Sequence, residues 1–493
     1  MGGAPDLQLA LLRFSGDVGT KARATRFRFQ GRLLQNLRDA LRSAGVAPRV
    51  RVSRDRIFVE VPNRAAVEAL ARVFGVQSIS LVECRTATRL EEITSAGEEL
   101  FRERVRGRRF AVRARRVGNR NRIPVSAREV ERTLGAALLP VSAGVDLGDP
   151  EVTARVEIGE GEAYFFSETT RAHGGLPLGV EGRALALISG GFDSAVAAWH
   201  LLKRGVALDY AFCNLGGATH QLGALRVAKV LADRWSYGDR PQLHAVDFSP
   251  LVEELQTRTQ RRYWQVLLKR QMLRAADSLA RARRAEAIVT GEVVGQVSSQ
   301  TLRNLAVISR ASSAPILRPL VGFNKEEIIA VAQRIGTFEL SKVVGEYCAM
   351  VPQRPATGAS ERAVLEQERQ LDPSLLERAV AGCTVFDLRS LDLEKLELPD
   401  LEVERIPEGA TLLDLRSKAD YERWHHADAL RMDFPQALRA YPNFDRSVVY
   451  VLYCEIGLKS AHLAELMREA GFDAYHFKGG QPALAHRVAA ARR

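Results

Sequence analysis

The stretch ALALISGGFDSAVAAWHLLKRG, residues 184–205, decides the fold of the central part of this chain. Its apolar beginning, residues 184–188, has the length of a buried β-strand. The second half has the period of an amphipathic helix that ends at Gly205. The residues expected on the buried face of this helix are Val196, Trp199 and Leu202. The stretch therefore predicts a strand, a short loop and a helix in direct succession.

The loop between strand and helix has the chemistry of a phosphate-binding site. It reads Ser189-Gly190-Gly191-Phe192-Asp193-Ser194. Because glycine has no Cβ atom, its backbone N–H groups can turn toward an anion, and the helix N-terminus adds the positive end of its dipole. No lysine follows the glycines, which excludes the loop that holds nucleotides for γ-phosphate hydrolysis. The alternative, an ordinary glycine-rich turn, is less favoured because the full hexapeptide is present.

The hexapeptide resembles the PP-loop of the ATP pyrophosphatases, enzymes that cleave ATP between the α- and β-phosphates and adenylate a substrate. This resemblance implies that Asp193 holds Mg²⁺. It also implies that the hydroxyl groups of Ser189 and Ser194 contact phosphate oxygens. The enzyme class expected for the central domain is therefore an adenylating one.

The sequence around the hexapeptide predicts a doubly wound parallel sheet, because strand-like runs alternate with helical patterns. The further strands are expected at residues 207–213, 242–248 and 287–290. We assign residues 176–390 to this domain, and expect a connector rich in Leu, Glu and Asp over about 356–405. The Gly- and amide-rich loop 291–301 follows one of the strands, so it is expected at the same sheet edge as the hexapeptide.

Bulk properties limit the class of protein. A chain of 493 residues is expected to form three or four domains. No apolar run reaches the roughly 18 residues of a membrane span, and the first residues do not read as a secretory signal, so no membrane partner is expected. The five cysteines are scattered without zinc-site spacing, which argues against a structural metal and suits a reducing cytoplasm.

The net charge of +12 is unevenly distributed. The first two thirds of the chain are basic, whereas residues 361–493 hold more acidic than basic side chains. This asymmetry indicates a polyanionic partner for the front and the middle of the chain only.

The basic front divides into two expected α+β units, residues 1–63 and residues 64–168. The arginines of a hairpin in the first unit are expected to face solvent: Arg49, Arg51, Arg54 and Arg56. The second unit, with an expected edge strand at 163–168, carries a row of candidate RNA-binding side chains: Arg109, Arg113, Arg115, Arg116, Arg120 and Arg122. Aromatic residues are sparse there, which favours phosphate contacts over base stacking. The alternative is a solvated charged face.

The last expected unit, residues 408–493, contains a candidate nucleophile. Cys454 follows a β-branched strand and precedes a helix, so backbone N–H donors and the helix N-terminus favour its thiolate. A lone cysteine is more often a buried apolar filler, but this strand–loop–helix setting favours a functional thiol. The frame of Cys454, Gly457 and Ser460 resembles the rhodanese domain, in which the loop cysteine carries sulfur as a persulfide. Ile456 stands where that family often has arginine, so a protein sulfur donor is expected rather than free thiosulfate.

Taken in order, these units resemble the long form of the ThiI family, the tRNA 4-thiouridine synthases with a rhodanese tail. The segments that carry the resemblance are LISGGFDS, NLGGATH, LKRQMLRAA, TGEVVGQVSSQT, ILRPLVGFNKEEI and EYC. The resemblance implies a multidomain α+β and α/β fold. Its parts would be a ferredoxin-like unit, an RNA-binding THUMP domain, a PP-loop domain and a rhodanese-like domain.

The same resemblance implies site residues. The expected ATP-binding positions are Leu187, Ile188, Ser189, Gly190, Gly191, Ser194, Lys269, Gly291 and Gln300. Taken alone, Lys269 reads as a solvated helix lysine. Cys454 matches the persulfide cysteine and Cys348 its disulfide-forming partner. Taken alone, Cys348 reads equally well as a buried cysteine.

The implied reaction converts uridine 8 of tRNA to 4-thiouridine, using ATP and Mg²⁺. The implied partners are tRNA, a cysteine desulfurase of the IscS type, and the ThiS carrier protein of thiamine synthesis. The alternative is a sulfur-relay protein that serves mainly ThiS. A homodimer is left open, and the expected location is the cytoplasm.

Overall fold

The computed structural model of the chain describes residues 7–53, 55–344, 355–396 and 400–491. Two compact units can be distinguished, and each is described by itself below. The first comprises Met1–Glu181, Leu202–Val206 and Tyr237–Asp239, and the second comprises Gly182–Leu201, Ala207–Ser236 and Arg240–Arg493. Within the described ranges, none of the helices combines the length and the apolar character needed to cross a membrane.

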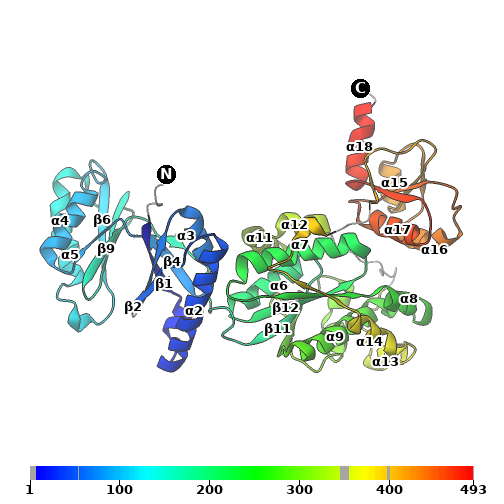
Figure 1. Ribbon diagram of the computed structural model, residues 1–493, viewed down its shortest axis with the longest axis horizontal. Coiled ribbons are helices and arrows are strands. Elements are labelled where there is room, and N and C mark those ends of the chain that lie inside the picture. The colour runs from blue at the N-terminus through cyan, green and yellow to red at the C-terminus, as the bar shows by residue number, and fades with distance from the viewer. Residues whose placement is uncertain (1–6, 54, 345–354, 397–399, 492–493) are drawn as a thin grey trace. The chain divides into compact units, whose positions relative to one another are not determined.

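The first unit begins with a five-stranded antiparallel sheet of order β10-β4-β1-β3-β2 (Figure 1). Its strands are β1 Gln8–Phe14, β2 Val50–Ser53, β3 Arg56–Val61, β4 Val76–Leu81 and β10 Thr170–Arg171. Its helices are α1 Gly16–Gly19, α2 Arg23–Ser43 and α3 Arg64–Ala71. Helix α2 places Leu33, Leu37 and Leu41 at helical spacing, and all three pack into the core of this sheet.

The expected boundary at residue 63 lies inside this first module. Strand β4 pairs antiparallel with β1, with Ala10 opposite Leu81, and α3 contacts both β3 and β4. The chain also returns from the next module to add β10 beside β4. The physical reason is that β1 is a central strand and needs hydrogen-bonded neighbours on both sides, which residues before 63 do not supply alone.

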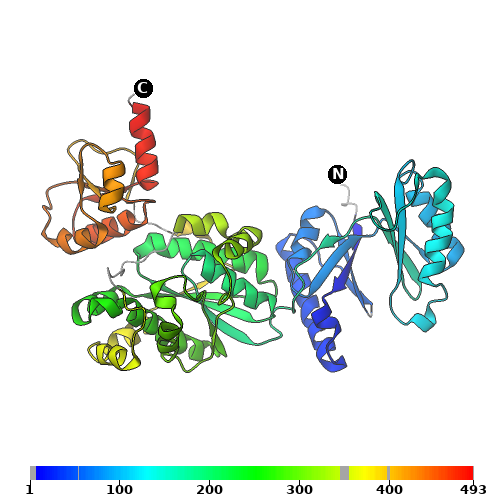
Figure 2. The same ribbon diagram turned by 180° about the vertical axis from the view of Figure 1, so that it is seen from behind.

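The next module is a second five-stranded sheet of order β5-β9-β8-β6-β7. Its strands are β5 Cys84–Ala87, β6 Arg109–Arg116, β7 Gly144–Val145, β8 Val152–Ile158 and β9 Glu162–Phe166. Helices α4 Leu90–Phe101 and α5 Ala127–Leu138 pack together on this sheet (Figures 1 and 2). Strand β9 lies between β5 and β8, so the expectation of an edge strand there was wrong: β5 covers the side left open in the sequence reading.

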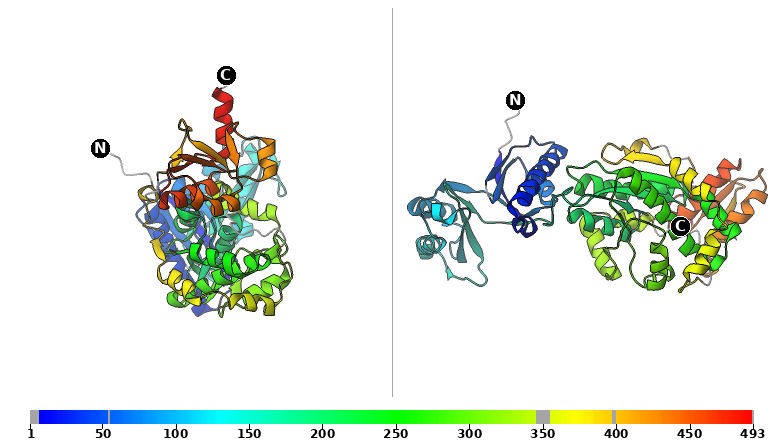
Figure 3. Two further views of the ribbon diagram at one scale, coloured as in Figure 1. Left: turned by 90° about the vertical axis from the view of Figure 1, so that its right-hand side faces the viewer. Right: turned by 90° about the horizontal axis from the view of Figure 1, so that it is seen from below.

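The central domain holds a six-stranded sheet of order β15-β14-β11-β12-β13-β16. Its strands are β11 Arg183–Leu187, β12 Ala207–Asn214, β13 Gln242–Asp247, β14 Ala287–Val289, β15 Ile316–Leu317 and β16 Thr384–Asp387. Its helices are α6 Phe192–Lys203, α7 Gly217–Trp235, α8 Ser249–Arg258, α9 Trp264–Arg283, α10 Leu302–Ser309, α11 Lys325–Ile335, α12 Phe338–Val344, α13 Glu361–Glu368 and α14 Pro373–Ala381. Helices cover both faces of the sheet (Figures 1 and 3).

The expected doubly wound sheet is confirmed, with one addition. All strands run parallel except β16, which pairs antiparallel with β13 at the edge. The expected connector therefore contributes structure to this domain, namely α13, α14 and β16. Arg270 on α9 and Glu368 on α13 form a nearly buried ion pair at 2.8 Å, which ties that segment to the core.

The tail is a parallel sheet of order β17-β21-β20-β18-β19, orange to red in Figure 2. Its strands are β17 Glu402–Val403, β18 Thr411–Asp414, β19 Ala429–Arg431, β20 Tyr450–Tyr453 and β21 Ala474–Phe477. Its helices are α15 Lys418–Arg423, α16 Phe434–Ala440, α17 Leu458–Glu469 and α18 Gly480–Ala491. The α/β character expected for the tail is confirmed, although β17 begins before residue 408.

Candidate functional site

The hexapeptide loop connects β11 to α6 and is closed by its own hydroxyl groups. The Ser189 N–H donates to Ser194 Oγ at 3.2 Å, and Ser194 Oγ donates to the Gly191 carbonyl at 3.2 Å. The Gly191 N–H reaches Ser189 Oγ at 3.4 Å. Gly190 has a φ of +79°, a conformation that favours glycine. These internal hydrogen bonds therefore hold the loop in one defined conformation at the N-terminus of α6.

Asp193, in the first turn of α6, lies between an amide and an ammonium group. Gln296 Nε2 donates to its Oδ2 at 2.9 Å, and Lys325 Nζ lies 3.2 Å from its Oδ1. Lys325 is the first residue of α11, where Asn324 and Glu327 form a capping box. Lys325 belongs to the segment ILRPLVGFNKEEI, but the sequence alone predicted no role for this lysine. The Asp193 side chain is 18% exposed, so its carboxylate is partly open to solvent beside the loop.

Gly291 explains how a second loop reaches the hexapeptide. A Cβ atom at this position would lie 2.6 Å from both the Asp193 carbonyl carbon and the Ser194 nitrogen, which are backbone atoms and cannot yield. Only glycine permits this approach. The structure thus brings loop 291–301 to the same sheet edge as the hexapeptide, as the sequence predicted.

Glu292, next in that loop, gathers two cations. Lys269 Nζ lies 3.0 Å from one carboxylate oxygen, and Arg318 Nε lies 2.8 Å from the other. Burial would raise the pKa of Glu292, but the two cations hold this pKa below its ordinary value. Lys269 is therefore fixed near the loop rather than being a freely solvated helix lysine. Arg318 was not identified from the sequence, because nothing local marks its distant carboxylate partner.

Gln300, at the end of the same loop, presents a buried acceptor. Gln300 is 8% exposed, and its Oε1 atom has no hydrogen-bond partner in the described part of the chain. A buried acceptor without a donor is unfavourable, so a ligand N–H group here would be stabilising. Leu187 and Ile188 lie at the end of β11, and the Ile188 N–H donates to the Ala211 carbonyl at 2.9 Å.

In the tail domain, Cys454 follows β20 and is almost completely buried, with 1% exposure. The Gly457 N–H donates to its sulfur at 3.2 Å, and the Ser460 hydroxyl lies 3.5 Å from the sulfur and 3.0 Å from the Gly457 carbonyl. An apolar filler would not need such polar neighbours, so the geometry favours a functional thiol. Gly457 has a φ of +97° and begins α17.

A segment that the sequence reading missed closes the cysteine loop from the other side. The Gln481 N–H, in the first turn of α18, donates to the Cys454 carbonyl at 2.8 Å. A Cβ at Gly480 would lie 2.7 Å from that same carbonyl oxygen, so glycine is required there. The Ile456 side chain is 43% exposed beside this loop.

The six candidate RNA-binding arginines do not form one uniform row. Arg109 pairs with Asp146 at 2.9 Å, Arg122 lies 3.7 Å from Glu160, and Arg113 donates to the Leu147 carbonyl. The other three line a hollow of about 350 Å³ together with basic residues of the first sheet module: Arg115, Arg116, Arg120, Arg26 and Arg56. The sequence reading did not identify Arg26 as part of this set.

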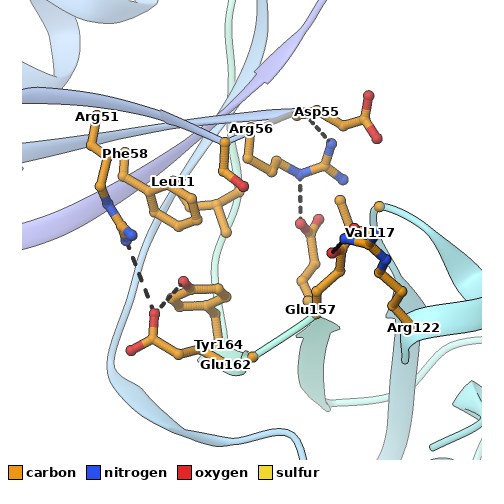
Figure 4. Close-up of a pocket in the computed structure, with 15 residues that line it drawn as sticks. Leu11, Arg51, Asp55, Arg56, Phe58, Val117, Arg122, Glu157, Glu162 and Tyr164 are labelled. Carbon is orange, nitrogen blue, oxygen red and sulfur yellow. Dashed lines mark hydrogen bonds and ion pairs between the residues drawn. The ribbon is translucent and has the colours of Figure 1, made fainter. Parts of the chain in front are cut away.

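A neighbouring pocket of about 460 Å³ lies between the two sheet modules of the first unit (Figure 4). Arg56, which lines it, was expected to face solvent, and this was wrong. Its Nε lies 2.6 Å from Glu157 of β8, and Arg13 Nε of β1 lies 2.7 Å from the other carboxylate oxygen. One buried carboxylate therefore joins both modules. Burial alone would raise the pKa of Glu157, yet the two guanidinium groups hold this pKa below its ordinary value.

Cys348 lies outside the described residues. Among the cysteines in the described ranges, Cys84, Cys213, Cys383 and Cys454 are all free thiols. The structure therefore brings the hexapeptide, Asp193, Lys269, Gly291 and Gln300 to one sheet edge. The cysteine loop belongs to the tail domain and the arginines to the first unit.

Four protein families match successive segments of this chain. Residues 9–80 match the ThiI ferredoxin-like domain and residues 87–168 match the THUMP domain. Residues 179–372 match the family described as thiamine biosynthesis protein (ThiI), and residues 400–486 match the rhodanese-like domain. The expected order of domain types is confirmed.

Relatives cover nearly the whole chain. A tRNA sulfurtransferase of Pyrobaculum aerophilum is 37% identical over 475 residues, which is 96% of this chain and 97% of the relative. A tRNA sulfurtransferase of Desulfurococcus amylolyticus is 38% identical and covers 95% of this chain and 97% of its own length. A solved 4-thiouridine synthetase, in complex with RNA and with bound ATP, is 29% identical with a TM-score of 0.66. The match covers 77% of this chain and 99% of that one.

Proposed function

This chain belongs to the ThiI family of tRNA sulfurtransferases, and we propose that it converts uridine 8 of tRNA to 4-thiouridine in an ATP-dependent reaction. The observation that carries the proposal is the hexapeptide loop, closed by Ser189 and Ser194, with Asp193 beside it. The solved RNA and ATP complex of a 4-thiouridine synthetase supports both substrates. The thiols suit a reducing cytoplasm as the place of reaction.

ATP would lie along the edge of the central sheet. The N–H groups of the hexapeptide and the two serine hydroxyls would bind its phosphates, with Lys269 as a nearby cation. The acceptor-only Oε1 of Gln300 fits an amino group such as that of adenine, with Leu187 and Ile188 lining the strand end. Gly291 permits the loop to close against this site.

Asp193 also fits a magnesium ion, because Mg²⁺ is usually held by one or two carboxylates together with substrate phosphates. Such an ion would neutralise charge on the departing pyrophosphate. The residues of the chain supply the rest. Lys325 lies next to the same carboxylate and places a second positive charge near the phosphates.

Uridine O4 is a poor leaving group, and adenylation converts it to a good one. The O4 atom attacks the α-phosphorus of ATP, and pyrophosphate leaves with the electron pair of the broken P–O bond. The terminal sulfur of a Cys454 persulfide then attacks C4 and displaces AMP. In this direct path the product joins C4 to Cys454 through a disulfide bond. In the alternative path the Cys348 thiolate attacks the Cys454 sulfur first, and the released sulfide displaces AMP from C4.

Cys348 would complete the transfer. Its thiolate attacks the Cys454 sulfur and breaks the bond to the transferred sulfur, which stays on C4. This leaves 4-thiouridine and a Cys348–Cys454 disulfide, and a cellular dithiol must supply two electrons before the next cycle. The persulfide itself would come from a cysteine desulfurase of the IscS type. The exposed Ile456 offers an apolar surface beside the loop for such a protein donor.

The experiment incubates the full chain with unmodified tRNA, ATP, Mg²⁺, a cysteine desulfurase and cysteine, and measures 4-thiouridine absorbance. The wild type is expected to form product, and Asp193→Ala is expected to form none. Glu253→Ala, exposed on α8, is the matched control and should keep full activity. No product with the wild type, or full product with Asp193→Ala, would contradict the proposal.

Sulfur transfer to the ThiS carrier is a second proposed activity, supported by the description of the matching family as a thiamine biosynthesis protein. In the alternative, a relay that serves mainly ThiS, the tRNA would be a minor acceptor. A Cys454→Ser strain distinguishes the two. If it loses thiamine prototrophy and keeps thiolated tRNA, the relay is favoured; if it loses thiolated tRNA, the tRNA reaction is.

A further inference from the structure

Helix α17 carries two features that the proposed reaction does not yet connect. It begins directly after the Cys454 loop, and two turns later its Glu465 contacts the central domain. The Glu465 carboxylate accepts the Ala218 N–H of α7, at 2.9 Å to one oxygen and 3.2 Å to the other. The two helices also pack along each other.

The N-terminus of α7 lacks a cap from its own segment. Its N-cap residue is Gly216, which has no side chain to cap the helix, and Asn214 Oδ1 accepts the N–H of Gly216 itself at 3.1 Å. The first N–H groups of a helix have no intrahelical acceptor and carry the positive end of the dipole. Glu465 satisfies one of them with its carboxyl oxygens, so the tail domain supplies an acceptor at the N-terminus of α7. Burial raises the pKa of this carboxyl group.

The backbone of α7 is shaped for this close approach. Gly217 has a φ of +71°, and a Cβ atom there would overlap Glu465 and lie 3.1 Å from His462 Nδ1. A side chain at this position would displace the Glu465 carboxylate and would also strain the backbone. Gly217 therefore has a role at the contact with the tail, whereas a Cβ at Gly216 would meet His220 of α7 itself, 2.9 Å from its Cβ.

The contact between α17 and α7 also buries two histidine side chains. His462 of α17 is 7% exposed and His220 of α7 is 4% exposed. Burial lowers the pKa of each imidazole to about 4, so both are neutral near pH 7. Burial is the largest effect on the pKa of His462. The hydrogen bond with the Gly216 backbone and the charge of Asp247, at the end of β13, act to raise this pKa.

These partners lie at the functional edge of the sheet. Gly216 and Ala218 follow the end of β12, and β12 pairs in parallel with β11, the strand that leads into the hexapeptide loop. Since the carboxyl ends of parallel strands share one edge, α17 contacts the same edge that holds the proposed adenylation site.

We propose that the α17–α7 contact is the docking surface that holds the sulfur-carrying loop at the adenylating domain, with Glu465 as a positioning residue for sulfur transfer. The docking proposal depends on the proposed function only because 4-thiouridine formation is one of the quantities measured. Glu465 touches neither ATP nor uridine in this scheme. It acts by fixing α17, whose first turn contains the Gly457 and Ser460 donors to Cys454.

The test compares Glu465→Lys with Glu465→Gln and with the control Glu469→Lys, which reverses an exposed charge one turn further along α17. Three quantities are measured: pyrophosphate released in a single turnover with tRNA, persulfide on Cys454 by mass spectrometry, and 4-thiouridine. Glu465→Lys should keep the first two and lose at least tenfold in kcat for 4-thiouridine, with unchanged KM for ATP and tRNA. Glu465→Gln, which keeps an acceptor, should fall between, and Glu469→Lys should match the wild type.

A direct readout keeps the proposal testable if Glu465→Lys disturbs the tail or if the wild type makes no 4-thiouridine. Hydrogen exchange of the peptide containing Ala218 should be slow in the wild type, at least tenfold faster in Glu465→Lys, and intermediate in Glu465→Gln. Equal exchange in all chains would overturn the docking surface, whatever the activity. Full 4-thiouridine formation by Glu465→Lys would overturn its role in sulfur transfer. Failure of the wild type to thiolate tRNA, with exchange as expected, would instead contradict the proposed function.

Discussion

Lys325 Nζ lies 3.2 Å from Asp193 Oδ1, although the two residues are 132 positions apart. Each residue stands in the first turn of its helix, α11 and α6, so two helix N-termini converge on one ion pair. The Lys325 ammonium also lies 5.4 Å from the Phe192 ring. The arrangement places one positive and one negative side chain beside a loop shaped for phosphate.

Replacing Lys325 should therefore impair adenylation more than ATP binding. A preorganised positive charge at a developing negative charge contributes roughly 10²–10³ in rate. For Lys325→Ala we expect the rate of pyrophosphate release to fall by about that factor, with a smaller change in KM for ATP. Lys342→Ala, an exposed lysine of α12, should behave as wild type. Equal kcat values for the two variants would contradict a role for Lys325 at the phosphates.

Gly291→Ala tests the contact between the two loops. The added methyl group would lie 2.6 Å from backbone atoms of Asp193 and Ser194, so loop 291–301 must move away from the hexapeptide. Overpacking of this kind costs about 1–3 kcal/mol, and we expect a lower melting temperature together with weaker ATP binding by calorimetry. At Gly322 a Cβ meets no atom within 4 Å, so Gly322→Ala is the control. Unchanged ATP affinity in Gly291→Ala would mean that the approach does not form the site.

Ser460→Ala tests the donors at the cysteine. The Ser460 hydroxyl lies 3.5 Å from Cys454 Sγ and 3.0 Å from the Gly457 carbonyl, and a hydrogen bond contributes about 0.5–1.5 kcal/mol. Persulfide formation on Cys454, followed by mass spectrometry, should slow severalfold, by up to about tenfold. Ser447→Ala, at an exposed turn of the same domain, should leave the rate unchanged. The same rate in both variants would show that the hydroxyl does not stabilise the thiolate.

The strands of the central sheet were predictable because their apolar runs are short and bounded by glycine or by helical patterns. The structure places β11 to β14 within one or two residues of the expected limits. The hexapeptide and the cysteine loop were also visible, since their residues are contiguous. Lys325, Arg318 and Gly480 were not, because each meets its partner only after the chain folds.

The misplaced first boundary has a different cause. Nothing in the local sequence near residue 63 distinguishes a helix and strand of a new domain from those that complete the first sheet. Strand pairing decides this, and β4 pairs with β1. The expectation that Arg56 faces solvent was wrong for a similar reason. The alternation of side chains along β3 predicts on which face of the sheet Arg56 lies, but it does not predict that Glu157 of another sheet pairs with Arg56 there.

That carboxylate should make the stability of the first unit depend on pH. The folded-state pKa of Glu157 lies below its ordinary value, so its ion pairs stabilise the fold fully above the unfolded pKa near 4.5. This stability is lost as the pH falls through the lower, folded-state pKa. Thermal unfolding of the full chain should show the loss as a falling melting temperature of the first unit below about pH 4.5.

Glu157→Gln should remove this pH dependence and destabilise the unit at pH 7, by about 3 kcal/mol, because two guanidinium groups then lose their buried counter-charge. The control is Glu60→Gln, whose carboxylate pairs with Arg49 in an exposed position. We expect the control to change the free energy of unfolding by less than about 1 kcal/mol. An acid transition that is the same in the wild type and in Glu157→Gln would contradict this account.

The arrangement of the arginines in the second module predicts how tRNA binding depends on salt. Arg115 and Arg116 line a basic hollow with Arg26, whereas Arg109 is already paired with Asp146 at 2.9 Å. A cation that neutralises a phosphate releases a counterion, so its removal should reduce the slope of log affinity against log salt by about 1. We therefore expect Arg115→Ala and Arg116→Ala each to weaken binding and flatten the slope. Arg109→Ala should leave the slope nearly unchanged, since acidic neighbours compensate its charge, and equal slope changes in all three would show a merely diffuse positive surface.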